Sequence, residues 1–141
     1  MNDEAVFLLD TVTVSKLTDE QLSSDLVQQN CKLPEEIMHE LENNPKQVSV
    51  QTLGEAVNAA LLLKASELLT QPSVQRLLDL YGFEGNGDVL LLAQAVLGKE
   101  VGQLQFFSKR WVIVSDDKKL IAAAIANGID TLDTSSFAGL L

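Results

Sequence analysis

AVFLLD, at residues 5–10, is a continuous apolar run that ends in an aspartate. Five apolar residues without polar alternation indicate a β-strand that is buried on both faces. WVIV, at residues 111–114, has the same character near the other end of the chain. Strands of this kind are typical of parallel sheets covered by helices on both sides. Because helical segments lie between the two runs, the sequence predicts an α/β protein with three layers, α/β/α.

The remaining segments alternate between helical and extended patterns. Thr18 followed by Gln21 resembles a capping box, and Asn127-Gly128 suits the left-handed end of a helix. We expect a turn at residues 11–13 and strands at 48–53 and 129–132. Helices are expected at residues 15–29, 34–42, 55–69, 72–81, 88–97, 118–126 and 134–141, with a short helix around 104–107. Glycines at 82, 85 and 87 indicate a loop.

The composition is that of a globular protein. The chain has 141 residues, 46% of them hydrophobic and 21% charged, which predicts a single domain spanning residues 1–141. No apolar run approaches the roughly 20 residues of a membrane span, and the acidic start MNDE differs from a basic secretory signal. The single cysteine, Cys31, excludes an internal disulfide and a cysteine zinc site. We therefore expect a cytoplasmic protein that does not enter a membrane.

Acidic residues outnumber basic residues by two to one. Twenty Asp and Glu against ten Lys and Arg give a net charge of −10. Proteins that bind nucleic acid by neutralising phosphates normally carry a basic face. Three interpretations stay open: the protein binds no nucleic acid, some acids hold metal ions that reverse the local charge, or a partner supplies the basic surface.

Several acids are expected at one edge of the predicted sheet. Asp10 ends the first strand, and Asp116 and Asp117 follow the 111–114 strand after one serine. Asp88, at the start of a helix, and Glu40, on the helix after Pro34, can reach the same edge. In open α/β sheets the functional crevice lies at the carboxyl ends of the strands. Converging carboxylates repel one another unless a cation lies between them, and Mg²⁺ or Mn²⁺ prefers such oxygen ligands.

Each of these acids also has a purely structural interpretation. Asp88 and Asp116 suit helix caps or first-turn positions. Asp10 suits an Asx-turn, and Glu40 suits a solvent-facing helix position. Taken singly, none of the acids identifies a metal site.

Other chemical classes are less well supported by the residues. His39 is the only histidine, so a His-Glu-x-x-His zinc motif is excluded, and the chain has no nucleophile-elbow sequence. The glycine-rich loop lacks the Gly-Lys-Ser/Thr of a phosphate-binding loop. Lys118 and Lys119 follow the acids and can contact a phosphate, with a solvated helix face as the structural alternative.

Four stretches together resemble the PIN-domain family of metal-dependent nucleases, which includes the VapC-type toxins. FLLDT at 7–11 resembles the family's apolar strand that ends in Asp-Thr. LPEEIMHEL at 33–41 is similar to its helix with a metal-site glutamate, and GD at 87–88 followed by LLLAQA at 90–95 to its third motif. VIVSDDKKL at 112–120 resembles its "Val-Thr-x-Asp" strand end.

The resemblance implies a parallel sheet of about five strands and an endoribonuclease that binds Mg²⁺ or Mn²⁺. It assigns the metal-binding and catalytic roles to Asp10, Glu40, Asp88 and Asp117. Asp116 is a substitute for Asp117, and Glu36 is an alternative to Glu40. The implied substrate is RNA, and the implied partners are an antitoxin protein and a second copy of the chain.

A second hypothesis is a PIN-like interaction module without catalytic activity. The family commonly has Asn or Ser after Asp-Thr, where a polar side chain supports the first acid, and this chain has Val12. The net charge of −10 and the scarcity of basic residues favour the same hypothesis.

Overall fold

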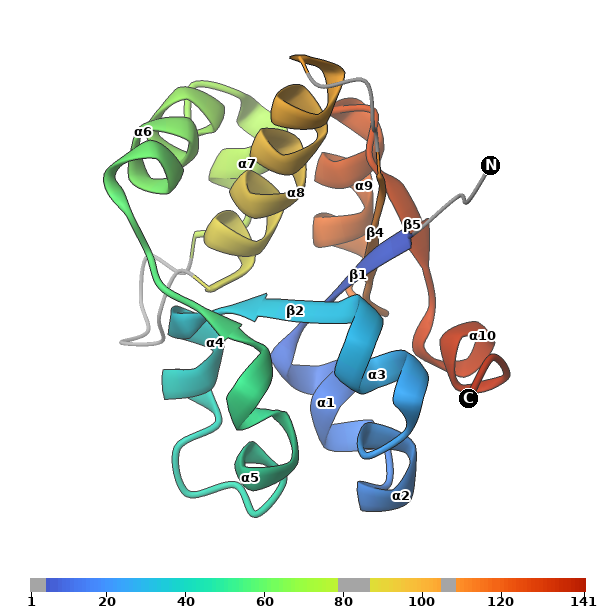
Figure 1. The fold of residues 1–141 in the computed structure, drawn as a ribbon. Helices are drawn as coiled ribbons and strands as arrows, with labels where there is room; N and C mark the ends of the chain where they lie inside the picture. The colour runs from blue at the N-terminus through green and yellow to red at the C-terminus, as the bar shows by residue number, and fades with distance from the viewer. Residues whose placement is uncertain (1–4, 79–86, 105–108) are drawn as a thin grey trace.

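A five-stranded sheet forms the centre of the computed structural model, which describes residues 5–78, 87–104 and 109–141 (Figure 1). The strand order is β3-β2-β1-β4-β5, and every neighbouring pair is parallel. The strands are β1 (Ala5–Leu9), β2 (Cys31–Pro34), β3 (Gly54–Glu55), β4 (Arg110–Val114) and β5 (Asp130–Leu132). The predicted three-layer α/β/α fold with about five parallel strands is confirmed.

The two continuous apolar runs of the sequence form the two central strands. β1 pairs with β4 over its whole length, from Ala5 opposite Arg110 to Leu9 opposite Val114. Successive side chains of a strand point to opposite faces, so each strand contributes to two cores. Leu8 and Leu9 are both fully buried for this reason, one in each core.

Helices cover both faces of the sheet (Figure 1). One face carries α6 (Ala59–Leu68), α7 (Pro72–Gln75), α8 (Gly87–Leu104) and α9 (Lys118–Ala126). The other carries α1 (Thr11–Lys16), α2 (Asp19–Leu22), α3 (Asp25–Asn30), α4 (Glu35–Glu40), α5 (Gln47–Val50) and α10 (Thr134–Ala138). In the second core the rings of Phe7 and Phe137 pack with their centroids 5.1 Å apart.

Several local predictions are confirmed. Thr18 and Gln21 form the predicted capping box at the start of α2. The predicted helix at 118–126 is α9, and Gly128 follows it with a φ of 71°, the left-handed conformation that favours glycine. No helix in the described part of the chain is long and apolar enough to cross a membrane.

Other predicted elements are wrong or shifted. Residues 48–53 form α5 and the 3₁₀ helix η1 (Gln51–Leu53) instead of a strand. Val50 and Leu53 lie three residues apart and are buried, whereas Val48 is 71% exposed, so the apolar positions follow a helical face. Residues 11–13 belong to helix α1 rather than a turn. The helix predicted from residue 55 begins at Ala59, because Gly54–Glu55 pairs as β3 and the side chain of Asn58 caps α6.

The helix predicted at 88–97 is longer than expected and continues through Gly98 to Leu104. The predicted short helix around 104–107 therefore overlaps the end of α8, and its residues 105–107 lie outside the described residues. The helix predicted at 72–81 ends at Gln75 as α7. Residues 79–81 and residues 82–86 of the predicted loop at 82–87 also lie outside the described ranges, and Gly87 begins α8.

Gly98 lets α8 pack closely on β4. A Cβ at this position would lie 2.3 Å from both Cε2 and Cζ2 of Trp111. In an open helix Gly→Ala adds about 1 kcal/mol of stability. Here we expect Gly98→Ala to lower the free energy of unfolding by about 1–3 kcal/mol, because the indole must move.

Urea unfolding of Gly98→Ala measures this effect, with Trp111→Leu as the matched background. In Trp111→Leu the added methyl meets no ring, so Gly98→Ala should then be neutral or stabilising. Equal destabilisation in both backgrounds would show that the Trp111 contact is not the cause.

Candidate functional site

The strand order creates a switch point between β1 and β4. From β1 the chain passes to β2 and β3 on one side, and it then crosses to β4 and β5 on the other side. Ligands of open α/β sheets bind outside the carboxyl ends of the strands at such a point. Asp10 directly follows β1, and Ser115, Asp116 and Asp117 directly follow β4.

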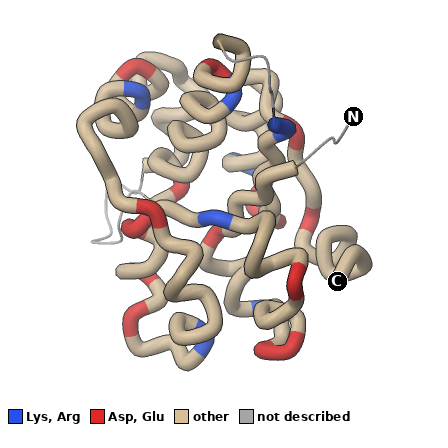
Figure 2. Tube along the Cα trace, in the orientation of Figure 1, with Lys and Arg blue, Asp and Glu red and all other residues tan. Residues whose placement is uncertain are grey.

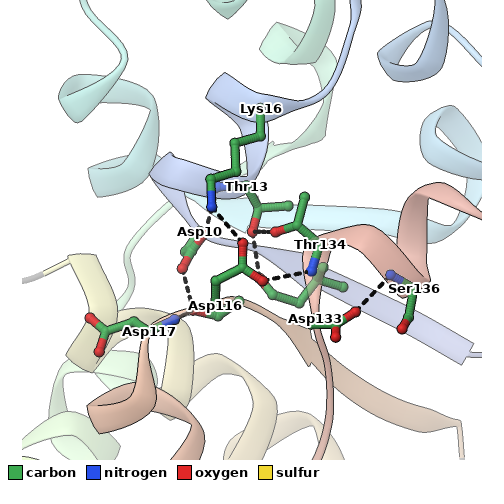
Figure 3. A network of polar contacts seen from close by, with 10 residues as sticks. Asp10, Thr13, Lys16, Asp116, Asp117, Asp133, Thr134 and Ser136 are labelled. Atoms are coloured by element: carbon green, nitrogen blue, oxygen red, sulfur yellow. Dashed lines mark hydrogen bonds and ion pairs between the residues drawn. The ribbon is translucent and has the colours of Figure 1, made fainter.

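Asp10 is held in place by two hydrogen bonds. Its side chain is 4% exposed, and Oδ1 accepts a hydrogen bond of 2.8 Å from the backbone N–H of Thr13, which caps α1. Oδ2 accepts a hydrogen bond from the hydroxyl of Ser115, which is fully buried. Asp10 is thus the capping residue of α1 instead of the Asx-turn residue that its structural interpretation predicted, and the cap fixes its carboxylate at the strand edge (Figure 3).

Ser115 also fixes Asp117. Its hydroxyl oxygen accepts a hydrogen bond of 3.0 Å from the backbone N–H of Asp117. One oxygen of Asp117, Oδ1, accepts a 2.9 Å hydrogen bond from the N–H of Lys119 and so caps α9. The single hydroxyl thus ties the carboxylate after β1 to the backbone after β4.

Asp88 lies in the first turn of α8 and is electrostatically coupled to both of these acids. Its pKa is raised to about 6, mainly by burial and then by the negative charges of Asp10 and Asp117. The structure therefore brings Asp10, Asp88 and Asp117 together in one negative environment.

Glu40 lies beside the N-terminal end of α8. A Cβ on Gly87 would lie 2.1 Å from Oε2 of Glu40 and 2.8 Å from Cδ1 of Ile37. The carboxylate of Glu40 thus lies directly against Gly87, the residue before Asp88. Glu36, the alternative acid, lies one turn earlier on α4, so the packing against Gly87 distinguishes Glu40 from it.

Asp116 has a different role from Asp117. Its Oδ1 accepts a hydrogen bond of 2.9 Å from the backbone N–H of Thr134, and its Oδ2 lies 2.8 Å from Nζ of Lys16. The hydrogen bond with Lys16 is the main cause that lowers the pKa of Asp116 to about 2, followed by the Thr134 N–H. Figure 3 shows the carboxylates of Asp116 and Asp117 pointing in different directions. Asp116 thus joins the end of β4 to α1 and α10.

Four polar residues that contact these acids or one another were not predicted from the sequence: Ser115, Lys16, Thr13 and Thr134. Thr13 donates a 3.1 Å hydrogen bond to the carbonyl of Val114, and its hydroxyl lies 2.9 Å from that of Thr134. The polar residues of VTVSK after Asp10 and the lone serine in VIVSDD were the available signals.

The donor chemistry of the acids suits a hard divalent cation, but the arrangement is not a preformed cage. Among the described residues, no group of three or more His, Cys, Asp or Glu is placed to hold a metal ion. Two observations nevertheless indicate an incomplete environment. The raised pKa of Asp88 comes first from burial and then from the nearby charges of Asp10 and Asp117. The buried hydroxyl Oγ1 of Thr11, next to Asp10, has no hydrogen-bond partner in the described part.

Lys118 and Lys119 are exposed at the start of α9, directly after Asp117. This position places two positive charges at the rim of the acidic edge.

No protein-family model matches this chain, and no curated protein matches it either.

The raised pKa of Asp88 predicts a pH-dependent effect of Asp88→Asn. The pKa of 3.8 in a free side chain becomes about 6 in the folded protein, so the folded state binds the proton more tightly. The contribution of Asp88 to stability is then fully present below pH 4 and is lost as the pH rises through 6. Relative to the unmodified protein, Asp88→Asn should be about 2 kcal/mol more stable at pH 7.5 and nearly equal at pH 4.

Urea unfolding of both proteins in EDTA between pH 4 and 7.5 measures this difference. Asp133→Asn is the matched control, because the pKa of Asp133 is lowered by its hydrogen bonds to Ser136 and the pH trend should be opposite. A difference between Asp88→Asn and the unmodified protein that does not change with pH would contradict the coupling.

Proposed function

We propose that the protein is a PIN-like endoribonuclease that depends on Mg²⁺ or Mn²⁺. The observation that carries the proposal is the electrostatic coupling of Asp88 to Asp10 and Asp117 at the switch point of the sheet. A cation between these acids would balance the negative charges of Asp10 and Asp117, which together with burial raise the pKa of Asp88. The strand edge with three acids and the five-stranded parallel sheet are what the family resemblance implies.

Asp10, Asp88, Asp117 and Glu40 would hold the ion. Asp117 offers one carboxylate oxygen that does not cap α9, and the exposed carboxylate of Glu40 lies beside Gly87 at the start of α8. When bound, the ion supplies an activated water and neutralises charge on a phosphodiester. The hydrogen bonds from Ser115 and Thr13 keep the Asp10 carboxylate oriented at the edge.

Binding of RNA by a chain with a net charge of −10 requires local positive charge. Lys118 and Lys119 at the rim of the site would contact phosphates, and the bound cation would reverse the sign of the acidic centre. The resemblance to VapC-type toxins extends this proposal to the toxin of a toxin–antitoxin pair, with an antitoxin protein and a homodimer as partners.

The catalytically silent interaction module remains the second candidate. Two observations favour it. Asp10 and Asp117 each cap a helix, and among the described residues the acids do not form a preformed cation site. The two functions differ in one measurable respect, because only the nuclease requires the folded protein to bind a divalent ion.

Cleavage of a mixed-sequence single-stranded RNA tests the nuclease directly. We expect cutting with Mn²⁺ and none with EDTA. Asp10→Asn, Asp88→Asn and Asp117→Asn should each lower the rate at least 100-fold, because each removes a proposed ligand while keeping the size of the side chain. Denaturing gel electrophoresis of end-labelled RNA measures the rate, and circular dichroism checks that each variant is folded.

Two further aspartates give matched controls. Asp133→Asn changes a helix-capping aspartate outside the proposed ligand set and should keep full activity. Asp116→Asn should keep cleavage but lower stability, since it weakens the Lys16 and Thr134 contacts. The assignment of Asp117 would be wrong if Asp116→Asn abolished cutting and Asp117→Asn did not. Absence of cutting together with no Mn²⁺-induced rise in melting temperature would favour the silent module.

A further inference from the structure

The two aspartates that follow β4 differ in what holds their carboxylates. Both oxygens of Asp116 have partners from other elements: Oδ1 accepts a 2.9 Å hydrogen bond from the backbone N–H of Thr134, and Oδ2 lies 2.8 Å from Nζ of Lys16. Asp117 accepts a hydrogen bond from its own turn, through Oδ1. The carboxylate of Asp116 is thus fixed by α1 and α10, whereas one oxygen of Asp117 takes no part in the cap of α9.

Lys16 brings a positive charge to the α1 side of the acidic edge. It is the last residue of α1, the helix that Asp10 caps. Hydrogen bonds of Thr13 fix this helix against the end of β4 and the start of α10. The pKa of Lys16 is raised, first by its hydrogen bond with Asp116 and then by the charges of Asp116 and Asp10. The ammonium therefore lies within electrostatic reach of both carboxylates (Figure 3).

The acids of the edge fall into two groups by the charges they interact with. Asp88 interacts with Asp10 and Asp117, whose charges add to burial in raising its pKa. Asp116 interacts instead with the cation Lys16 and with α10. The positive charge of Lys16 thus balances Asp116 on the side of α1 and α10, while negative charges meet on the side of α8 and α9.

We propose that Lys16 is a positioning residue: it holds Asp116 toward α1 and α10 and so leaves Asp117 as the aspartate after β4 that binds the divalent ion. This inference rests on the proposed function, because it concerns the same ion at the same edge. A carboxylate with a cation on one oxygen and an N–H on the other is a poor ligand for a second cation, because the ammonium must first be displaced. Without Lys16, the Thr134 N–H alone holds Asp116, and Oδ2 is available to an ion.

Binding of Mn²⁺ by the full chain tests the proposal, with the free ion measured by electron paramagnetic resonance. We expect Asp117→Asn to weaken Mn²⁺ binding at least tenfold, because it removes a proposed ligand. Adding Lys16→Met should then tighten binding at least fivefold relative to Asp117→Asn alone, because Oδ2 of Asp116 takes the place of the missing ligand. Lys16→Gln, which also removes the charge, should give the same recovery. Adding Asp116→Asn should abolish the recovery.

Two controls separate positioning from net charge. Acidic residues outnumber basic residues and are spread over many elements (Figure 2), so the loss of any lysine favours cation binding through long-range attraction. Lys32→Met removes one positive charge from another exposed pair, with Glu55 at 2.7 Å, and should give no comparable recovery in the Asp117→Asn background. Lys16→Arg keeps the charge beside Asp116 and should give none. Exposed pairs of this kind contribute little to stability, so the variants should fold, and circular dichroism checks this.

The outcomes distinguish this proposal from the proposed function. If the unmodified protein binds Mn²⁺ and Asp117→Asn weakens binding, but neither Lys16→Met nor Lys16→Gln restores it, the cation site stands and the role of Lys16 is overturned. That role is also overturned if Asp117→Asn alone keeps full binding, if Lys32→Met gives an equal recovery, or if the recovery survives Asp116→Asn. If the unmodified protein binds no Mn²⁺, the proposed function fails and the role of Lys16 fails with it.

Discussion

Parallel pairing of β1 with β4 is the constraint on which the acidic edge depends. The two strands are far apart in sequence, yet five consecutive residue pairs align them. Leu8 and Ile113 lie opposite each other and are fully buried, so a slip of one residue would move side chains from one core to the other. The fixed register places Asp10 beside Ser115, and the serine hydroxyl then ties the carboxylate to the backbone of Asp117.

The acids at this edge carry structural and electrostatic roles at the same time. Asp10 caps α1 and Asp117 caps α9, whereas Asp116 accepts hydrogen bonds from Lys16 and from the backbone N–H of Thr134. Asp88 has burial and two negative neighbours as the causes of its raised pKa. A fold that keeps such an acid in place bears a stability cost at neutral pH, and costs of this kind are common at functional sites.

Much of the fold could be predicted because its main signals are local. The apolar runs at 5–9 and 111–114 have the pattern of buried strands, and both form strands. The capping box at Thr18 marks the start of a helix, and Gly128 marks the end of α9. The segment at 48–53 misled the prediction because its apolar residues fit both a period of two and a helical face. Only the packing of Val50 and Leu53 in the core decides between them.

From the sequence, the candidate site could be predicted only as a group of acids near the carboxyl ends of the strands. Asp116 and Asp117 are adjacent, and which of them faces Asp88 depends on contacts with Lys16 and Thr134 from distant elements. In the same way, the sequence does not distinguish Glu40 from Glu36, and only the structure shows that Glu40 lies against Gly87.

The central claim is that the sheet edge between β1 and β4 is the place where this acidic protein binds a divalent cation. Paramagnetic broadening by substoichiometric Mn²⁺ in ¹H–¹⁵N NMR spectra tests it most directly, because the effect reports location without requiring a substrate. The account predicts that the amide signals of Asp10, Thr11, Asp88 and Asp117 broaden first. Earlier broadening at the exposed acids Asp19, Glu20, Glu35 and Glu42, with the sheet edge unaffected, would contradict it.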